Sequence, residues 1–367
     1  MRGSDIQQHG FFSYLSPEGR VPEAHPLRRI RTLVEKALRR MDPELSAAYA
    51  RHGRPSIPPE RLLKAQLLMA LFSIRSDRQF CEQLDYNLLF RWFLGLSPDD
   101  PIFNPSTFSK NRDRFLNHGI ARRLRAEVTQ IAREEGLLSD EAFSVDGTLI
   151  EAWASMKSFK PIETADSTQT PIDDDDSSNP TVDFRGEKRS NNTHRSTTDP
   201  DARLYKKGKG KSSQLCHMGH VLMDNLHGLV STAMVTQAGG KAEIEAMLLM
   251  LGEITEAGLN PKAVAGDAGY HTAESVESMR WENIKPHFAR HPGRKTKGLD
   301  GRTVRSFSYR EAQKIRKRIE EIFGWMKTIG GLRKSRFKGT ERTGQLVELV
   351  STAYNLLRIG KLLQGQK

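Results

Sequence analysis

The sequence is poor in cysteine, with Cys81 and Cys216 as its only two among 367 residues. Two cysteines cannot build the disulfide framework on which small secreted domains depend. No secretory signal peptide precedes them, so we expect a protein of a reducing cytoplasm.

Long apolar runs are missing as well. No stretch reaches the roughly 18 apolar residues that a membrane-spanning helix requires, so we expect no membrane partner. A hydrophobic content of 37% and a mean hydropathy of −0.58 fit a chain with about two or three ordinary cores. No repeat of solenoid length is visible.

Acidic residues are scarce in one segment. Residues 290 to 342 contain 17 Lys or Arg and 5 Asp or Glu, and this surplus equals the net charge of +12 of the whole chain. Such a field attracts polyanions, with a binding strength that falls steeply with salt. A basic amphipathic membrane helix is the alternative, but glycines interrupt the segment and it has no long apolar face. Nucleic acid is therefore the leading partner.

The first part of the chain is predicted to be helical. Apolar residues recur at helical spacing over 27–38, and a second helix is expected to begin at Pro58. A later helix presents Lys110 and Arg112, which suits a helix that lies against phosphates or in a major groove. An ordinary solvated helix face explains these two cations equally well. We expect an all-α domain over residues 1–135.

The second part, residues 136–367, is predicted to contain an α/β domain. Residues 141–150 alternate as in a strand, with Asp146 on the side opposite the apolar one. The region at about 158–198 is predicted to be a mobile acidic insertion. Its run Asp173–Asp176 lacks the spaced ligands and turn glycine of a calcium loop, so solvated disorder is favoured.

Order is expected to return with a hairpin over 214–235, followed by a helix over 242–257. A strand at 263–265 then delivers Asp267 just past its end. A helix from about residue 272, a strand at 284–288 and a long basic helix complete the pattern. The result is a mixed five-stranded sheet, in which three strands form a meander and two follow by parallel crossovers.

Glu320 has two interpretations. In the basic helix it lies on a stripe at the edge of the predicted buried face, where a side chain is half buried and oriented. It also stands four residues after Arg316, and an exposed ion pair explains it about as well. Glu321 is explained by the same spacing from Lys317.

Three carboxylates on three elements favour the functional interpretation of Glu320. Strand ends of a sheet with parallel crossovers meet at a crevice, where Asp146, Asp267 and Glu320 are expected to converge. Converging carboxylates repel one another unless cations join them, and Mg²⁺ prefers oxygen ligands. The chemistry implied is phosphodiester attack assisted by two metal ions.

The residues also carry a family resemblance, in blocks that cover nearly the whole chain in one order. The chain resembles bacterial insertion-sequence transposases of the DDE class that have an InsH-like N-terminal domain. The blocks of that N-terminal domain are Phe12-Ser13-Tyr14, Arg20-Val21-Pro22, His25-Pro26-Leu27-Arg28 and Arg91-Trp92-Phe93-Leu94-Gly95-Leu96. The catalytic blocks are Val145-Asp146-Gly147-Thr148, Asp199-Pro200-Asp201-Ala202-Arg203, Gly266-Asp267-Ala268-Gly269-Tyr270 and Glu320-Glu321-Ile322-Phe323-Gly324-Trp325-Met326-Lys327.

The resemblance implies a ribonuclease-H-like catalytic domain behind the all-α N-terminal domain. It implies that Asp146, Asp267 and Glu320 are catalytic and bind two Mg²⁺ ions, which Mn²⁺ replaces. The family signature spaces Tyr, Arg, Glu and Lys so that Arg316, Glu320 and Lys327 fit, while Gln313 occupies the tyrosine place.

The implied function is hydrolysis at insertion-sequence ends, followed by transfer of the freed 3′-hydroxyl into target DNA. The implied partners are double-stranded DNA, both terminal repeats and target, and a second copy of the chain in a homodimer at the bacterial nucleoid. The rivals are a metal-dependent nuclease of the same fold and a catalytically silent DNA-binding repressor. The expected DNA contacts are Arg316, Lys327, Arg318, Lys334, Arg336, Lys110 and Arg112.

Other signals are given a structural interpretation. His217 and His220 lie three apart on a predicted strand and so face opposite ways, which favours hydrogen-bonded core histidines over a shared metal. Trp92 is predicted to be packing, and core positions are favoured over base stacking for Trp153 and Trp325. The rival carboxylates Asp199 and Asp201 flank a proline and are predicted to form turns or contact DNA.

Overall fold

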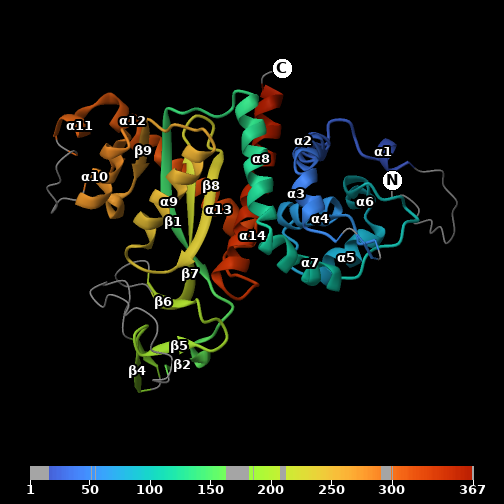
Figure 1. Cartoon of the computed structure of the whole chain (residues 1–367), viewed down its shortest axis with the longest axis horizontal. Coiled ribbons are helices and arrows are strands. Elements are labelled where there is room, and N and C mark those ends of the chain that lie inside the picture. Colours follow the sequence, from blue (N-terminus) through green and yellow to red (C-terminus); the bar gives the residue numbers. More distant parts are fainter. Residues whose placement is uncertain are drawn as a thin grey trace, which may run out of the picture.

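The computed structural model describes residues 16–50, 52–53, 55–162, 182–184, 186–206, 212–290, 299 and 301–365. The helices of the first part lie on one side of a central sheet, α10, α11 and α12 lie on the other side, and a group of short strands lies below the sheet (Figure 1). Among the described residues, no helix is both long and apolar enough to cross a membrane.

The first part is helical, as predicted. Pro26 opens one helix at its first position, where the missing N–H costs nothing, and the Ser76 side chain caps another by accepting from Gln79 N–H. Gly95 ends a third with a left-handed φ of 71°. The helices are α1 (Pro17–Arg20), α2 (Pro26–Arg40), α3 (Asp42–Ala47), α4 (Pro59–Leu71), α5 (Asp77–Tyr86), α6 (Leu88–Leu94), α7 (Ser106–Asn117) and α8 (Ile120–Glu134).

The central sheet has the strand order β10-β9-β1-β7, with β8 and the short β6 both pairing β7. β7 runs antiparallel to β1, β6 and β8, whereas β9 and β10 run parallel to β1. A meander on one side and two parallel strands on the other form a ribonuclease-H-like sheet, as predicted, with β6 as an additional strand. The strands are β1 (Ala142–Glu151), β6 (Arg203–Tyr205), β7 (Gln214–Asp224), β8 (Val230–Gln237), β9 (Ala263–Gly266) and β10 (Lys285–Phe288).

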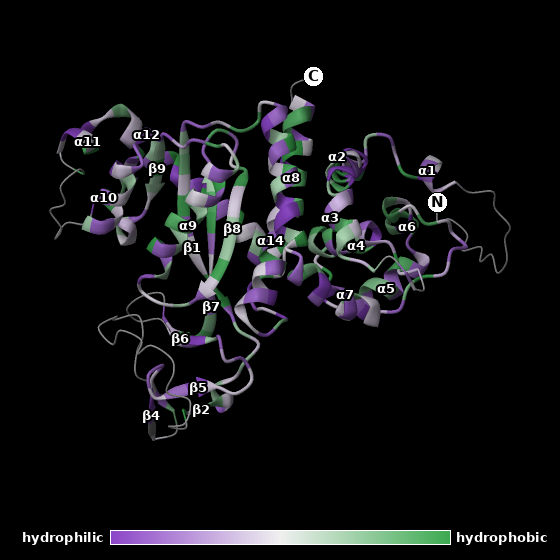
Figure 2. Cartoon of the chain, in the orientation of Figure 1, coloured by the Kyte–Doolittle hydropathy of each residue, from purple (hydrophilic) through white to green (hydrophobic). Residues whose placement is uncertain are grey.

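Helices cover both faces of this sheet. Phe143 and Val145 of β1 face a cluster that includes residues of α9 (Ala242–Glu256) and α10 (Ala273–Trp281). Ile150 belongs to a second cluster on the other face, with α8, α13 (Ile319–Thr328) and α14 (Thr340–Gly365). The strands β1, β7 and β8 are accordingly hydrophobic over much of their length (Figure 2). β1 is thus buried on both sides.

The expected domain boundary at residue 135 falls between α8 and β1, yet the hydrophobic core continues across it. α8 lies beside α14 and also contacts β8 (Figure 1). The buried Arg125 of α8 donates to Glu348 of α14 at 2.5 Å and to Glu253 of α9, and it also donates to the Ser231 carbonyl of β8. This ion network ties the helical part to the sheet.

The insertion predicted at about 158–198 is partly ordered at its edges. β2 (Phe159–Pro161) pairs β5 (His194–Ser196), and β3 (Val182–Phe184) pairs β4 (Glu187–Arg189), both antiparallel. The edges of the predicted insertion thus contain short strands. The acidic run Asp173–Asp176 lies outside the described residues.

The basic segment is not the single long helix that was predicted. It consists of α11 (Gly301–Arg305), α12 (Phe307–Ile315), one 3₁₀ turn over Arg316–Arg318 and α13. The tighter turn changes the angular relation between residues before and after it. Glu320, expected to be half buried, is exposed in the first turn of α13.

A candidate metal and DNA site at the edge of strand β1

β1 and β9 separate at one point in the sheet. Their parallel pairing runs from Ala142 opposite Ala263 to Ser144 opposite Ala265 and then stops. Asp146 and Asp267 each stand two residues beyond this last pair, so the register places them across from each other where the strands part. The sequence prediction that strand ends would bring these two carboxylates together agrees with this placement.

The other border of this opening is the segment that follows α13. Glu151 at the end of β1 donates its N–H to the Arg333 carbonyl at 3.1 Å and accepts from the Ser335 N–H at 2.7 Å. Lys334 between them forms an ion pair with the Glu151 carboxylate at 2.5 Å. The free edge of β1 therefore lies between Asp267 on one side and Lys334 on the other. We call this opening the β1 gap.

Each aspartate accepts a hydrogen bond from a nearby backbone N–H. Asp146 Oδ1 accepts from the Gly147 N–H at 2.8 Å, and Asp267 Oδ1 accepts from the Gly269 N–H at 2.8 Å. Both side chains are half buried. A backbone donor on one oxygen fixes a carboxylate without neutralising it.

Glu320 approaches the same region from the helical side. Its helix α13 packs against β1 on the face that carries Ile150, which by strand alternation is also the Asp146 face. Glu320 and Glu321 make no hydrogen bond or ion pair with any described residue, so neither i,i+4 pair considered from the sequence is present. Arg316 is half buried, and its Nε has no partner among the described residues.

Sequence reasoning missed a further carboxylate, Glu243, in the first turn of α9. It comes from the opposite face: a Cβ placed on Gly147 would lie 2.5 Å from Glu243 Oε1. A Cβ on Gly269 would lie 3.0 Å from Asp267 Oδ1 and 3.5 Å from Glu243 Oε2. Two positions without side chains thus leave room for Glu243 beside both aspartates. The glycine after Asp146 was the available sequence signal.

Tyr270 lies at the centre of these charges. Its ring packs near Gly266 and Phe288, it is fully buried, and its hydroxyl has no hydrogen-bond partner among the described residues. Burial raises the pKa of this hydroxyl well above its usual value, and the charges of Glu243, Asp146 and Asp267 raise it further, while Arg316 lowers it. All four charged groups are therefore close enough to act on one hydroxyl.

The donor chemistry of the β1 gap fits a hard divalent cation. Carboxylate oxygens are the protein ligands that Mg²⁺ and Mn²⁺ take. Within the described ranges, no three Asp, Glu, His or Cys side chains already stand at ligating distances. The carboxylates converge, but side-chain movement must bring them onto one ion.

Gln313, which stands where the family signature has tyrosine, braces the strand ends. Its side-chain amide donates to the Gly266 carbonyl at 3.3 Å and to the His287 carbonyl. Gly266 is the last residue of β9 and directly precedes Asp267, and His287 lies in the neighbouring strand β10. Gln313 therefore has a structural role that supports the position of Asp267.

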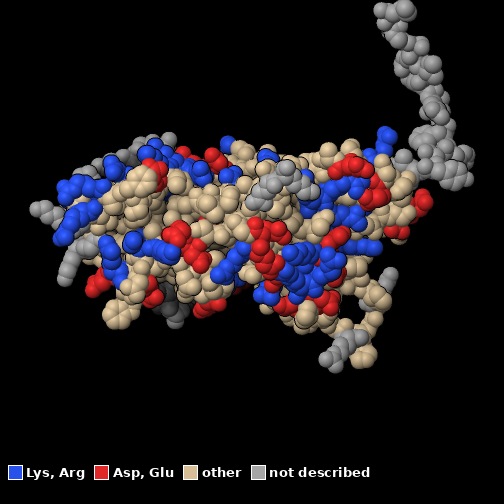
Figure 3. Space-filling model, turned by 90° about the horizontal axis from the view of Figure 1, so that it is seen from above, with Lys and Arg blue, Asp and Glu red and all other residues tan. Residues whose placement is uncertain are grey.

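The residues expected to contact DNA separate into two groups. Lys110 and Arg318 are exposed, and Lys327 and Arg316 are half buried near the β1 gap. Lys and Arg also gather over the end of the molecule formed by α10, α11 and α12 (Figure 3). The exposed cations of that end and the following turn are Arg302, Arg305, Arg310, Lys314, Lys317 and Arg318.

Arg112 and Arg336 form a separate group that holds two parts of the chain together. Both pair with Asp77, at 2.7 and 3.4 Å, and both guanidinium groups lie over the Phe337 ring. Burial lowers the pKa of Arg336 to about 10. The structure therefore gives both arginines, which the sequence predicted as DNA contacts, partners within the protein.

The discounted histidines are hydrogen-bonded core residues, as predicted. Both are fully buried; His217 Nε2 lies 2.9 Å from Asp199 Oδ2, and His220 Nε2 lies 2.8 Å from Thr236 Oγ1. Asp199 also accepts from the Gly339 N–H, and Asp201 accepts from the Thr340 N–H at 2.9 Å at the start of α14. Asp201 thus caps a helix.

The tryptophans considered from the sequence differ in burial. Trp92 is packing, since it is 4% exposed and donates to Glu18. Trp325 packs edge-on against Tyr354 at 5.6 Å. Trp153 is 50% exposed, and Lys334 Nζ lies 6.0 Å from its ring centre, so the core position favoured for Trp153 is wrong.

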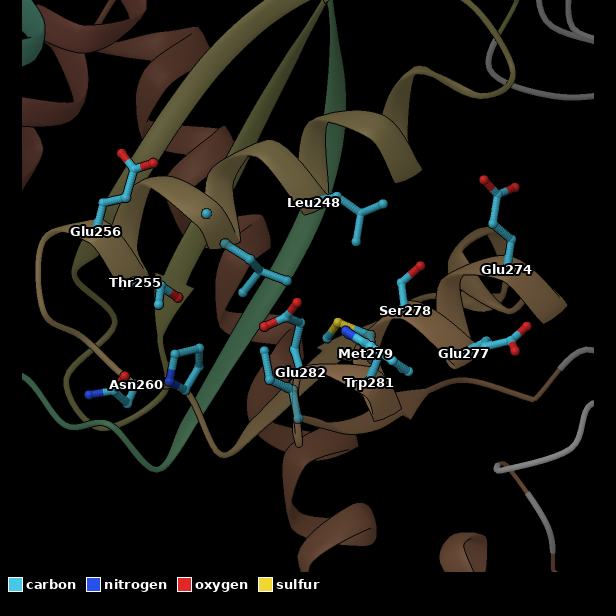
Figure 4. A pocket seen from close by; sticks show the side chains of 14 residues that line it. Leu248, Thr255, Glu256, Asn260, Glu274, Glu277, Ser278, Met279, Trp281 and Glu282 are labelled. Atoms are coloured by element: carbon cyan, nitrogen blue, oxygen red, sulfur yellow. The ribbon is translucent and has the colours of Figure 1, made fainter.

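A separate groove lies between the second half of α9 and α10. It has a volume of about 810 Å³, and Figure 4 shows its carboxylates around an apolar floor that includes Leu248 and Met279. The acidic lining residues are Glu256, Glu274, Glu277 and Glu282. A groove of this charge repels a phosphate backbone, which leaves the β1 gap as the candidate site.

Two family models match the chain. Residues 15–114 match a family described as a transposase domain, and residues 166–356 match one described as a transposase DDE domain. The second match contains Asp267 and Glu320 and begins after Asp146, whose assignment rests on the strand register.

Two solved structures are similar to the chain at low identity. A Mos1 transposase paired-end complex with the left transposon end is 11% identical with a TM-score of 0.21, over 74% of this chain and 80% of that one. A Mos1 mariner paired-end complex with Mn is 12% identical with a TM-score of 0.21, over 81% and 86%. The fold assignment rests on the strand order.

Proposed function

Because the chain belongs to the transposase DDE domain family, we propose that it cuts DNA at insertion-sequence ends and joins the freed ends to target DNA. The observation that carries this proposal is the β1 gap. Asp146 and Asp267 stand there in register, and the helix that bears Glu320 packs against the same strand.

In this proposal Asp146, Asp267 and Glu320 hold two Mg²⁺ ions, which Mn²⁺ can replace. When bound, such ions lower the pKa of water and stabilise charge on phosphate oxygens. The protein's own part is to orient the carboxylates, through the Gly147 and Gly269 N–H groups, and to seat the phosphate. In the same proposal Arg316, which is half buried and whose charge acts on the Tyr270 hydroxyl, pairs with a phosphate oxygen.

Two transfers at phosphorus follow in this scheme. A water oxygen first bonds to phosphorus at the element end, and the bond from phosphorus to the 3′-oxygen breaks, which frees a 3′-hydroxyl. That hydroxyl then attacks a target phosphodiester, and a target 3′-oxygen leaves. Each step exchanges one phosphorus–oxygen bond for another, so no external energy source is needed.

The basic surface provides the DNA seat. Arg318 ends the 3₁₀ turn before α13, Lys327 lies in α13, and Lys334 follows it on the border of the β1 gap; Lys110 of α7 is a further exposed cation. We propose that terminal repeats and target DNA bind here and that two copies of the chain pair the two ends. The acidic groove between α9 and α10 lies outside this path.

A joining assay tests the proposal. The full chain is incubated with Mg²⁺, target plasmid and labelled duplexes taken from the DNA that flanks its reading frame. Labelled ends covalently joined to plasmid support transposition. Cleavage without joining identifies a nuclease, and retarded DNA with neither product identifies a repressor; either result contradicts the proposal.

A further inference from the structure

Glu243 has an unusual environment for a residue in the first turn of a helix. Such acids commonly sit in solvent and interact with the helix dipole. Glu243 is instead half buried and directed at the β1 gap, with its two carboxylate oxygens near Gly147 and Gly269. Gly147 directly follows Asp146, and Gly269 lies two residues past Asp267.

The space around Glu243 depends on these glycines. At Gly147 a Cβ would stand 2.5 Å from Glu243 Oε1, closer than real Cβ atoms approach oxygen. The backbone there is extended and would accept alanine without strain, so glycine is not required for conformation. The absence of a side chain at Gly147 leaves the space that the Glu243 carboxylate occupies.

A second, independent feature points to a ligand. The Tyr270 hydroxyl is fully buried among Glu243, Asp146 and Asp267, and no described residue accepts or donates a hydrogen bond to it. A buried hydroxyl without a partner is unfavourable, because it has lost its hydrogen bonds to water and gained none in the protein. A cation with its water ligands would supply both the partner for the hydroxyl and the positive charge for the carboxylates.

We propose that Glu243 is a fourth carboxylate ligand of the metal centre, shared with Asp146 and Asp267, and that the Tyr270 hydroxyl hydrogen-bonds within that centre. The inference rests on the proposed function, since it extends the same site. α9 thereby holds the ion from one face of the sheet, while α13 with Glu320 covers the other. Glu243 is a metal ligand here, and Tyr270 is a positioning residue.

Mn²⁺ binding to the full chain without DNA tests this directly. Electron paramagnetic resonance of free Mn²⁺ gives the affinity for the unaltered protein and for Glu243→Gln, Glu243→Ala and Tyr270→Phe. The matched control is Glu245→Gln, an exposed glutamate two residues along the same helix. We expect about tenfold or greater weakening for each site variant, the scale for groups around a metal, and less than about twofold for the control.

Thermal unfolding without metal separates ligation from packing. Glutamine has nearly the size and shape of glutamate, so the packing around α9 is kept and Glu243→Gln should unfold within a few degrees of the unaltered protein. Mn²⁺ should then raise its unfolding temperature less. Unchanged Mn²⁺ affinity in both Glu243 variants, with or without lost stability, overturns the inference.

Asp146→Asn distinguishes failure of the Glu243 ligand from failure of the whole metal site. If Asp146→Asn weakens Mn²⁺ binding and the Glu243 variants do not, Glu243 is no ligand and the proposed function stands. If Asp146→Asn also binds Mn²⁺ like the unaltered protein, the metal site of the proposed function fails together with this inference.

Discussion

Gly147→Ala is the most informative single substitution at the β1 gap. The added methyl would lie 2.5 Å from Glu243 Oε1. Ordinary contacts require about 3.5 Å, so the carboxylate must move by about 1 Å. A terminal carboxylate can move that far at little cost. Alanine in an extended strand is also favoured over glycine by about 0.5–1 kcal/mol, so the metal-free protein should keep its stability or gain slightly.

Metal binding should respond in the opposite direction. A carboxylate displaced by about 1 Å no longer ligates well, and we expect Mn²⁺ affinity to fall about tenfold, equivalent to about 1.4 kcal/mol. Unfolding temperatures measured with and without Mn²⁺ show both effects in one experiment. The substitution should leave the unfolding temperature without Mn²⁺ unchanged and reduce the increase that Mn²⁺ produces.

Gly219→Ala is the control for crowding alone. Gly219 pairs with Thr148 across β1 and β7, and a Cβ there would lie 2.9 Å from the Ile150 Cδ1 methyl. Gly219→Ala and Gly147→Ala both add a methyl to a strand and create a similar steric conflict, but at Gly219 only the Ile150 methyl must move. If Gly147→Ala keeps the Mn²⁺ effect in full, or if Gly219→Ala loses it equally, the reasoning about Glu243 is refuted.

Further predictions concern stability and DNA binding. Arg125→Met should lower the free energy of unfolding by about 3–5 kcal/mol at pH 7.5, because it leaves buried Glu348 uncompensated, whereas exposed Arg122→Met should cost under about 1 kcal/mol in urea titrations. Burial raises the pKa of Glu348, so its protonated form is favoured by folding and the deficit should shrink as pH falls toward 5; a pH-independent deficit contradicts this. Gln313→Leu should lower the free energy of unfolding by about 0.5–1.5 kcal/mol, because it removes the amide hydrogen bonds to the Gly266 and His287 carbonyls, and calorimetry that finds no loss removes its bracing role. Arg318→Ala should reduce the slope of log DNA affinity against log salt concentration by about 1 without loss of stability, whereas Arg336→Ala should lower the free energy of unfolding. Equal effects of the two variants on that slope would show that Arg336 also contacts phosphate.

Much of the sheet could be predicted because its signals are local. Alternation over 141–150, a hairpin with its turn residues and strands followed by amphipathic helices each leave a pattern within about 15 residues. Asp146 and Asp267 were found for the same reason, since one stands on the polar side of a strand and the other ends one. That Asp146 and Asp267 lie across from each other then follows from the parallel register of β1 and β9.

Other features depend on partners far away in the chain. Glu243 looks like an ordinary first-turn acid of an amphipathic helix, and its role appears only when Gly147 and Gly269 are placed beside it. Arg112 and Arg336 read as surface cations, yet Asp77 lies 35 and 259 residues from them in sequence. The 3₁₀ turn before α13 could not be predicted either, since its residues are ordinary helix formers.

The most direct test of the central claim is metal-dependent cleavage of labelled element ends by Glu320→Gln and Glu321→Gln, measured beside DNA binding. The two residues are adjacent, exposed and equal in charge, so general electrostatics treats them alike. We predict that Glu320→Gln lowers the cleavage rate by about 10³-fold or more while DNA binding survives, and that Glu321→Gln is tolerated. Equal loss in both variants, or full activity in Glu320→Gln, contradicts the assignment of Glu320 to the catalytic triad.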